Sequence, residues 1–302
     1  MEFKDVLYLK IPPAINISFF LFLFVFMWGW FSSSLILKVS RNIPGPGPEY
    51  FGLKYENVSF KTSDGVDIAG WFIHSKEKSN KTIIICHGCG ADSPDVLPVT
   101  LFLNKKTGFN LLFFDFRNHG RSGGKVSSLG RLETYDLIAA VDFLKTQKPE
   151  FAAEIGVFGI SMGGAVAITA AAVDRRIGAV VADSPFSSFN YIISRYAKLF
   201  YRIPKYPLVP VTLFFTRFRL GFNPDNASAI RWVSKISPRP VFFIHGDMDE
   251  RIPLSESIKL YNSAGEPKQL WTVKGAGHME SYSANMSEYE RKVGEFYSKY
   301  LI

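Results

Sequence analysis

Apolar residues recur along this 302-residue chain with two spacings, which together predict alternating strands and helices. Short continuous apolar runs, typical of buried strands, occupy 81–86, 110–116, 155–160, 178–183, 240–247 and 268–273. Helical spacing, with apolar residues three or four positions apart, occupies 132–144, 165–172 and about 287–301. Strands that alternate with helices predict an α/β fold with a mostly parallel central sheet and helices on both faces.

Two stretches depart from this alternation. Two alternating apolar runs flank Ser63-Asp64-Gly65, which predicts an antiparallel β-hairpin at the start of the sheet. The segment between the runs at 178–183 and 240–247 has no strand signal and is far longer than the ~10–12 residues of a bare crossover. The extra length and the many Phe and Tyr residues of this segment predict an inserted helical cap at about 187–236.

The N-terminal region contains a long uncharged segment. Ile15–Leu37 comprises 23 residues without a charge, enough to cross a hydrocarbon layer of ~30 Å. A cleaved signal peptide is the alternative, but the run exceeds its usual apolar region of roughly 7–15 residues and no A-x-A site follows. A single-pass transmembrane anchor is therefore favoured. The flanking charges, Lys4 and Lys10 before the segment and Lys38 and Arg41 after it, are too balanced to predict its orientation.

These features divide the chain into consecutive parts. We expect an N-terminal tail at residues 1–14, a transmembrane anchor at 15–37, a stiff Pro/Gly linker at 38–50 and one folded domain, which carries the cap, at 51–302. A chain shortened to begin near Pro48 is then expected to be soluble and active.

The net charge of +8 is concentrated in the predicted cap. Between residues 190 and 235 there are eight basic residues and one acid, Asp225. Nucleic-acid binding is not expected, because no nucleic-acid motif accompanies the basic residues. A surface near anionic lipid headgroups fits the predicted anchor better, and a plain lid with a solvated charged rim is the alternative.

The two cysteines, Cys86 and Cys89, exclude a disulfide scaffold. They form one C-x-x-C without a second pair, and Cys86 ends an apolar strand, so neither redox chemistry nor a metal site is favoured.

One serine stands where an apolar strand pattern changes to a helical one. Ser161 is the centre of Gly159-Ile160-Ser161-Met162-Gly163, an instance of G-x-S-x-G. Glycines suit the flanks of a turn too sharp for side chains, and the residue at its apex points out of the fold. Ser161 is thus a candidate nucleophile.

A serine hydroxyl needs a base, and the base needs an orienting acid. In one known arrangement they follow in the order Ser, acid, His. Of the five histidines, only His278 follows both this serine and a late strand. Asp247, Asp249 and Glu250 are the candidate acids; Asp249 is favoured, because Asp247 is close enough to the strand to shape the turn.

Developing negative charge on a substrate oxygen needs backbone N–H donors. One is expected from Met162, which follows the candidate nucleophile. The other is expected from Cys89, in the "HGCGAD" loop after the strand at 81–86.

The motifs "HGCGAD", "DFRNHGRSGG", "GISMGG", "HGDMDERIP" and "GAGHME" occur in this order over about 55–301 and resemble the α/β-hydrolase superfamily. Within it, the chain is similar to the membrane-anchored, serine-aminopeptidase-like or Bem46-like branch. The resemblance implies that Ser161 is the nucleophile, Asp249 the acid and His278 the base, with oxyanion donors at Met162 and Cys89. It also implies a structural role for the loop that begins at Asp115. Many relatives carry a bulkier or amide side chain at the position of Cys89, which bears on substrate preference.

These inferences converge on a membrane-anchored serine hydrolase of the α/β-hydrolase fold. The expected substrate is a small-molecule or lipid-like acyl compound, cleaved at an ester or thioester bond without a metal or organic cofactor and without a nucleic-acid partner. A serine peptidase or amidase is the first alternative. A non-catalytic α/β-hydrolase scaffold used for binding is the second.

Overall fold

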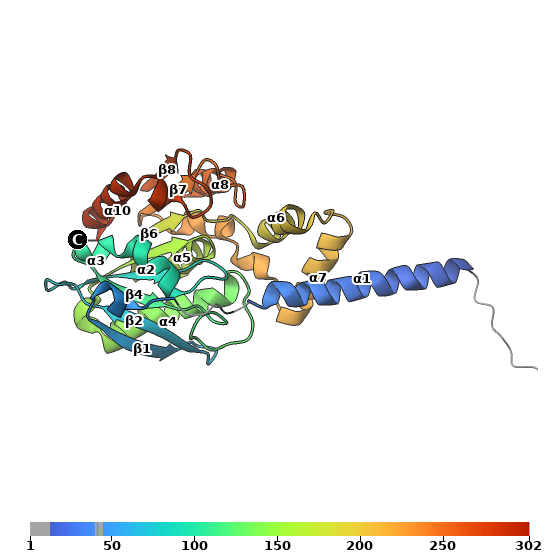
Figure 1. Ribbon diagram of the computed structural model, residues 1–302, viewed down its shortest axis with the longest axis horizontal. Coiled ribbons are helices and arrows are strands. Elements are labelled where there is room, and N and C mark those ends of the chain that lie inside the picture. The colour runs from blue at the N-terminus through green and yellow to red at the C-terminus, as the bar shows by residue number, and fades with distance from the viewer. Residues whose placement is uncertain (1–12, 40, 42–44, 302) are drawn as a thin grey trace, which may run out of the picture.

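The computed structural model describes residues 13–39, 41 and 45–301, so most of the predicted tail at 1–14 and four residues of the predicted linker lie outside it. Its centre is an eight-stranded sheet in the order β1-β2-β4-β3-β5-β6-β7-β8 (Figure 1). The strands are β1 (Tyr55–Lys61), β2 (Asp67–Ile73), β3 (Lys81–Cys86), β4 (Asn110–Phe114), β5 (Glu154–Ile160), β6 (Ile177–Asp183), β7 (Val241–Gly246) and β8 (Lys268–Val273).

The sheet is mostly parallel, as the sequence predicts. The strands from β4 through β3, β5, β6 and β7 to β8 pair in parallel, whereas β2 pairs antiparallel with both β1 and β4. The predicted hairpin therefore forms the antiparallel edge of the sheet. All parallel strands end at one edge, and the loops that follow β3, β5, β7 and β8 can meet there.

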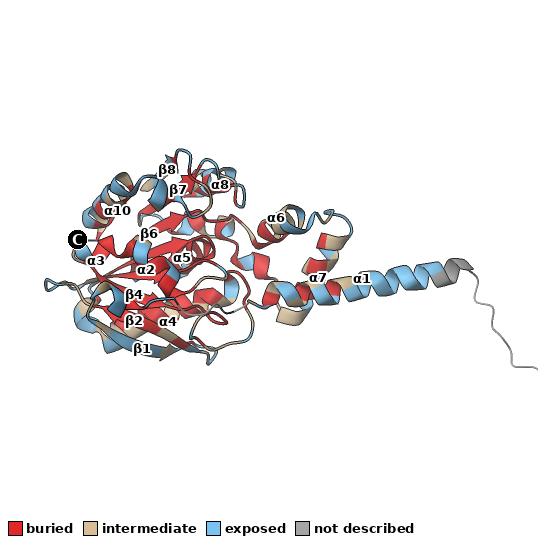
Figure 2. Ribbon diagram, in the orientation of Figure 1, coloured by how far each residue is buried: buried red, intermediate tan, exposed pale blue. Residues whose placement is uncertain are grey.

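Helices cover both faces of the sheet. On one face lie α4 (Arg131–Gln147), α5 (Met162–Val173) and α8 (Ser255–Ser263); on the other lie α2 (Ser93–Thr100), α3 (Phe102–Lys105) and α10 (Met286–Tyr300), with the short α9 (Ser281–Ala284) before it. Successive strand side chains alternate between two apolar cores: Ile84 packs in the first, and Ile83 and Ile85 pack in the second. Figure 2 shows the buried sheet between these layers.

The segment between β6 and β7 is helical. It comprises α6 (Phe189–Tyr201), α7 (Leu208–Leu220) and three short 3₁₀ turns, η3 (Pro224–Ala227), η4 (Ala229–Arg231) and η5 (Val233–Lys235). Ser188 begins α6 as an N-cap, its side chain accepting a hydrogen bond from the Tyr191 backbone N–H.

The N-terminal helix α1 (Pro13–Leu37) projects from the domain, and its residues 17–24 are exposed (Figures 1 and 2). Ile17–Leu37 is long and apolar enough to cross a membrane, with a mean hydropathy of 2.0, a test that a signal sequence also meets. Its last turns pack across α7, and the Leu37 carbonyl oxygen accepts a hydrogen bond from the Ser127 N–H at 3.0 Å. Residues 17–24 of α1 are thus exposed, whereas its last turns contact the rest of the protein.

Candidate active site

Ser161 lies at the turn between β5 and α5 in a strained conformation, with φ 54° and ψ −114°. Two glycines permit the turn. A Cβ on Gly159 would lie 2.3 Å from the Gly163 carbonyl oxygen, and one on Gly163 would lie 2.2 Å from that of Cys86. The Ser161 N–H donates to the Asp183 carbonyl oxygen at 2.8 Å. A strained non-glycine residue held this firmly is typical of a functional site.

His278 follows β8 and joins Ser161 to Asp249. Its Nε2 lies 3.2 Å from the Ser161 Oγ, and its Nδ1 lies 2.7 Å from the Asp249 Oδ2. The side chains of Asp249 and His278 are buried, as is Ser161. The three predicted residues, far apart in the sequence, form one continuous chain of hydrogen bonds.

Asp249 is held by its own loop. Its Oδ1 accepts hydrogen bonds from the backbone N–H groups of Arg251 and Ile252 at 2.9 and 2.8 Å. Burial by itself would raise the pKa of Asp249, but hydrogen bonds from His245 and His278 lower it well below its usual range. The carboxyl group is therefore ionised at neutral pH and accepts a hydrogen bond from the Nδ1–H group of His278.

The two neighbouring acids lie elsewhere. Asp247 is exposed, and its Oδ1 accepts a hydrogen bond from the Gly275 N–H at 2.6 Å, which connects the loops after β7 and β8. Glu250 is exposed, and its carbonyl oxygen accepts a hydrogen bond from Arg195 of α6 at 2.5 Å.

His245 at the end of β7 supports Asp249 and was missed by the sequence reasoning. Its Nε2 lies 2.6 Å from the Ile252 carbonyl oxygen, so this nitrogen carries the proton, and 3.3 Å from the Asp249 Oδ2. Its Nδ1 then accepts from the Ser257 hydroxyl at 2.6 Å. His245 is the first residue of "HGDMDERIP", the motif that contains Asp249, and this position is the one sequence feature that could have indicated its role.

A buried carboxyl group at the end of β6 was also missed. Asp183 accepts hydrogen bonds from Tyr289, Ser184 and Ser281 at 2.8, 2.8 and 3.1 Å, and burial raises its pKa. Because Ser281 follows His278 by three residues, Asp183 connects the turn that carries Ser161 with the loop that carries His278. No sequence pattern marks this contact.

Met162 and the loop that contains Cys89, the two expected sources of oxyanion donors, lie next to Ser161. Met162 is the first residue of α5, and the first N–H groups of a helix have no acceptor within it. A Cβ on Gly88 would lie 3.5 Å from the Ser161 Cβ, so the turn that contains Cys89 lies against the serine. Cys89 is exposed while Cys86 is buried in β3, and both are free thiols. Within residues 13–39, 41 and 45–301, no group of His, Cys, Asp and Glu is arranged to hold a metal ion.

Asp115 organises the loop that follows β4. Its Oδ1 accepts from the Ser93 N–H at 2.8 Å, and its Oδ2 accepts from the N–H and Nε of Arg121 at 2.9 and 3.1 Å. Burial opposes ionisation, but these hydrogen bonds lower the pKa of Asp115 overall. Asp115 thus joins the start of α2 to the loop that contacts Leu37 of α1.

Known proteins share both the sequence and the fold. Residues 77–235 match the family described as Serine aminopeptidase, S33. The uncharacterised protein YqkD of Bacillus subtilis is 37% identical over 235 residues, which cover 77% of this chain and 75% of that protein. The protein Bem46 of Schizosaccharomyces pombe is 25% identical over 227 residues, 74% of this chain and 70% of that protein.

A solved structure gives the same result. The esterase Pf2001 of Pyrococcus furiosus superposes with a TM-score of 0.75 and 30% identity, covering 88% of this chain and 99% of the esterase. The sheet order, the strand-to-helix turn and these relatives agree on one assignment. The chain is a hydrolase of the α/β-hydrolase fold and belongs to the Serine aminopeptidase, S33 family, in its Bem46-like branch.

Proposed function

We propose that the chain is a membrane-anchored serine hydrolase that cleaves carboxylic ester or thioester bonds through an acyl-enzyme. The observation that carries the proposal is the hydrogen-bond chain from Ser161 through His278 to Asp249, at a strained turn. A serine alone is a weak nucleophile, and this arrangement gives it a base with a fixed tautomer.

In the proposed reaction, the Ser161 Oγ attacks the acyl carbonyl carbon while the His278 Nε2 takes the hydroxyl proton. The N–H groups of Met162 and Cys89 bind the oxyanion. His278 then gives the proton to the departing alcohol or thiol, which leaves the acyl group on Ser161. Water, deprotonated by His278, attacks this acyl-enzyme and releases the carboxylic acid and the free serine.

The ester assignment draws on the esterase that shares the fold at 30% identity. Peptide or amide cleavage is the second candidate, favoured by the name of the matching family. The same apparatus serves both, so the leaving group distinguishes them. The anchor assignment draws on the length and hydropathy of α1.

The test is labelling of the full chain by a fluorophosphonate probe, followed by assays with a short p-nitrophenyl ester, a matched thioester and an aminoacyl anilide. We expect labelling at Ser161 and turnover of the ester and thioester. Ser161→Ala and His278→Ala should each lower kcat at least ~10³-fold, because the three residues act as a unit.

Three results would contradict the proposal. Near wild-type turnover by a folded Ser161→Ala variant would show that another group is the nucleophile. Faster turnover of the anilide than of the ester would favour the peptidase. A folded protein that neither reacts with the probe nor hydrolyses any substrate would favour a binding scaffold.

A further inference from the structure

The helices α1 and α7 cross at a glycine. A Cβ on Gly29 would lie 2.3 Å from the Phe215 Cδ2 and 2.7 Å from the Val211 Cγ1, so a larger residue would separate the helices. Beside the crossing, the hydroxyl groups of Ser32 and Thr212 lie 2.8 Å apart. Small residues at a close crossing, together with a hydrogen bond between hydroxyl groups, are characteristic of helices that associate in lipid.

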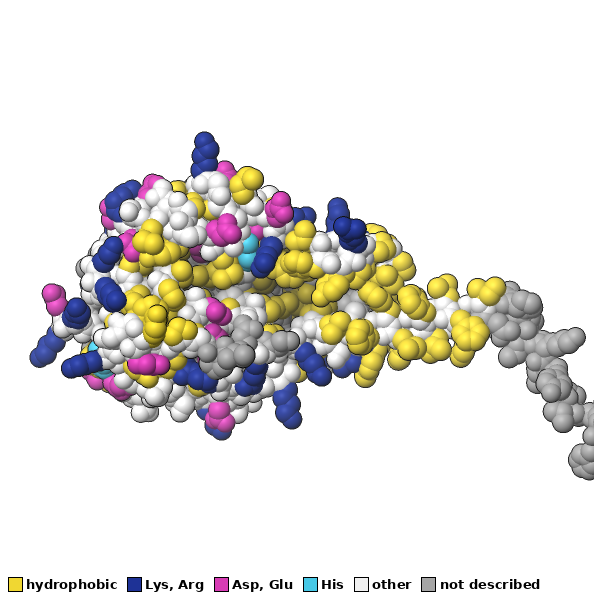
Figure 3. Space-filling view, viewed as in Figure 1, with side chains coloured by type: hydrophobic (Ala, Val, Ile, Leu, Met, Phe, Trp, Pro, Cys, Tyr) yellow, Lys and Arg dark blue, Asp and Glu magenta, His cyan; other side chains and the backbone are white. Residues whose placement is uncertain are grey.

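Beyond the crossing, the two helices form an open apolar corner of about 760 Å³. Its walls include Phe22 and Phe26 of α1 and Pro210, Phe214 and Phe218 of α7. Phe214 and Phe218 are 62% and 68% exposed, and with Pro210 they form one stripe along α7, four residues apart. Figure 3 shows apolar side chains continuing from α1 onto the neighbouring part of the domain.

The length of α1 places this corner relative to a bilayer. At ~1.5 Å per residue, the apolar stretch Ile17–Leu37 is about 30 Å long, which matches the ~30 Å thickness of the hydrocarbon layer. Gly29 lies inside this stretch. A bilayer matched to Ile17–Leu37 therefore contains the crossing, and with it α7, within its apolar layer or at its boundary.

Polar groups mark the boundary on the domain side of the corner. The Arg219 guanidinium lies 3.8 Å from the centre of the Trp30 ring and donates to the Trp30 carbonyl oxygen at 3.0 Å. Side chains with an apolar body and a polar tip are typical of the membrane interface.

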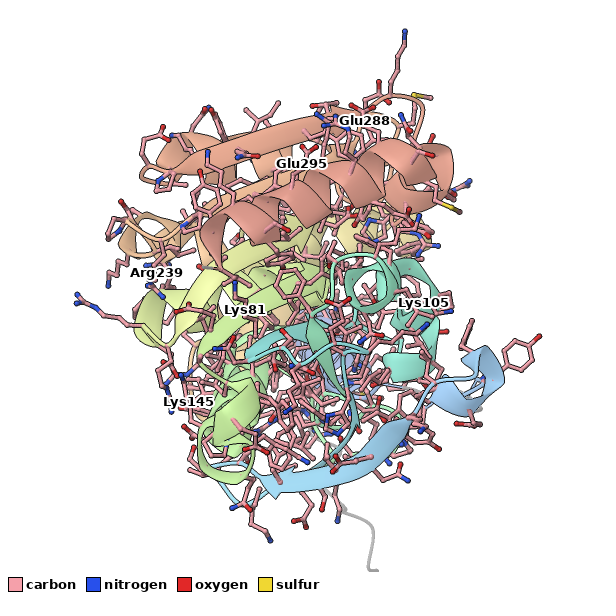
Figure 4. All side chains as sticks on the ribbon, turned by 90° about the vertical axis from the view of Figure 1, so that its left-hand side faces the viewer. Lys81, Lys105, Lys145, Arg239, Glu288 and Glu295 are labelled. Carbon is pink, nitrogen blue, oxygen red and sulfur yellow. The ribbon has the colours of Figure 1, made fainter. Side chains whose placement is uncertain are left out.

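The end of the molecule opposite α1 carries charges of both signs, including Lys105, Glu288 and Glu295 (Figure 4).

We propose that α7 lies in the plane of the membrane, with Pro210, Phe214 and Phe218 among the lipid acyl chains. The occupant of the corner is thus the hydrocarbon of the bilayer that α1 enters. An interfacial helix buries its apolar face ~5–10 Å into this layer. The inference rests on the membrane anchoring in the proposed function and does not require Ser161 to be the nucleophile.

The test is photo-crosslinking of the full chain in nanodiscs of phosphatidylcholine that carries an alkyne on its acyl chain. Phe214→p-benzoylphenylalanine and Phe218→p-benzoylphenylalanine variants are compared with the same substitution at Phe20 on α1 and at Tyr50, an exposed aromatic residue at the end of the predicted linker. All four side chains are at least half exposed, so the substitutions leave the core intact. We expect lipid adducts at positions 20, 214 and 218, and less than one tenth of that yield at position 50.

Adducts at position 20 but not at 214 or 218 would overturn the inference and leave the anchor standing. Crosslinks from 214 and 218 to a second copy of the chain would also overturn it, because protein would then cover the corner. If position 20 gives no lipid adduct either, the inference fails together with the proposed anchor. Fluorophosphonate labelling of Ser161 in the same samples reports separately on the hydrolase.

Discussion

At the scale of single residues, the site contains one strained backbone conformation and one buried charge, and neighbouring groups stabilise both. Ser161 has a positive φ that a serine rarely adopts, and the glycines on either side provide the space for it. Asp249 remains a carboxylate despite burial, because two backbone N–H groups and two histidines donate to it or lie against it. Most of these neighbours lie within four residues along the chain, and only His278 comes from a distant segment.

Asp249→Asn tests which acid orients the histidine. An amide there would present a donor to the His278 Nδ1 or favour the other tautomer, so we expect kcat for the p-nitrophenyl ester to fall about 10³–10⁴-fold. Asp247→Asn is the matched control, since Asp247 contacts the Gly275 N–H and not His278; a loss below about 10-fold is expected. The assignment of Asp249 fails if the two variants exchange these effects.

At the scale of secondary-structure elements, two contacts join segments that are distant in the sequence. No sequence pattern predicts either contact. Arg117 pairs with Asp64 in the β1–β2 turn and with Asp136 in α4. Through this arginine, the antiparallel hairpin is fixed to a helix on one face of the sheet. The other contact is the crossing of α1 and α7, through which the N-terminal helix packs against the helical segment between β6 and β7.

Asp64 makes stability depend on pH. The hydrogen bond from Arg117 is the main cause that lowers the pKa of Asp64 from 3.8 to about 2. Since the folded pKa is the lower one, this stabilisation is present above pH ~4 and is lost as the pH falls toward about 2. Asp64→Asn should therefore lower the Tm at pH 7, and the difference from wild type should shrink between pH 4 and pH 3.

The control for this prediction is Asp67→Asn, which removes an exposed pair with Lys61, where the carboxyl side chain is 76% exposed. Such pairs contribute little, so its Tm should stay close to wild type at both pH values. Tm is followed by intrinsic fluorescence in detergent. A Tm difference for Asp64→Asn that is constant from pH 7 to pH 3 would show that ionisation of Asp64 does not contribute to stability.

The packing of α1 changes the expected effect of removing it. The sequence predicts that a chain beginning near Pro48 is soluble and active, but Thr212 and Phe215 of α7 are buried and lie against Ser32 and Gly29 of α1. Their exposure costs ~25 cal/mol for each Å² of apolar surface. We now expect the shortened chain to have a lower Tm and to self-associate.

A full-length Phe20→Ala variant is the control; because this side chain of α1 is exposed, its Tm should match that of the full chain. Light scattering and thermal melting in the same detergent measure both effects. A monomeric chain beginning at Pro48 with an unchanged Tm would show that the contact between α1 and α7 adds little stability.

At the scale of the whole molecule, charge and apolar surface are distributed unequally. The exposed apolar helix and the cap are at one end, and the opposite end has mixed charges (Figures 3 and 4). Several basic residues of the cap have partners within the protein: Arg195 binds the Glu250 carbonyl oxygen, Arg219 binds Trp30, and Arg231 pairs with Asp225. Arg202 and Lys205, between α6 and α7, are exposed and better placed to meet lipid headgroups.

Arg202→Gln combined with Lys205→Gln should weaken binding of anionic lipid. Each basic side chain near a membrane surface contributes ~1 kcal/mol, about a fivefold change in affinity. Native mass spectrometry of the detergent-purified full chain measures how much phosphatidylglycerol remains bound relative to phosphatidylcholine. We expect a preference for phosphatidylglycerol that the double variant loses and that salt weakens.

Lys105→Gln combined with Lys299→Gln is the matched control. Lys299 lies over the Tyr300 ring at 4.9 Å, much as Lys205 lies over the Tyr206 ring at 5.4 Å. This variant loses the same charge from elsewhere on the domain and should keep the preference. An equal loss in both variants would show that net charge, and not its position, determines lipid binding.

Much of the fold was predictable because it depends on local patterns. The parallel strands, the hairpin and the helices α4, α5 and α10 follow apolar runs whose period reports burial directly. Helices α2 and α8 were not predicted. Pro94 and Pro98 conceal the helical spacing of α2, and α8 is short and mainly polar. Their helical structure depends on the sheet against which they pack.

The pattern of residues alone predicts the sharp turn at Ser161, because only glycine leaves room for the close backbone contacts on either side of it. It also predicts that Ser161, Asp249 and His278 meet, since each follows a parallel strand and these strands end at one edge of the sheet. The hydrogen bonds of Asp183 with Ser281 and Tyr289, and the crossing of α1 and α7 at Gly29, are visible only in the folded structure. These contacts join segments far apart in the chain, and their energy depends on distances and burial that exist only once the sheet and the helices around it have formed.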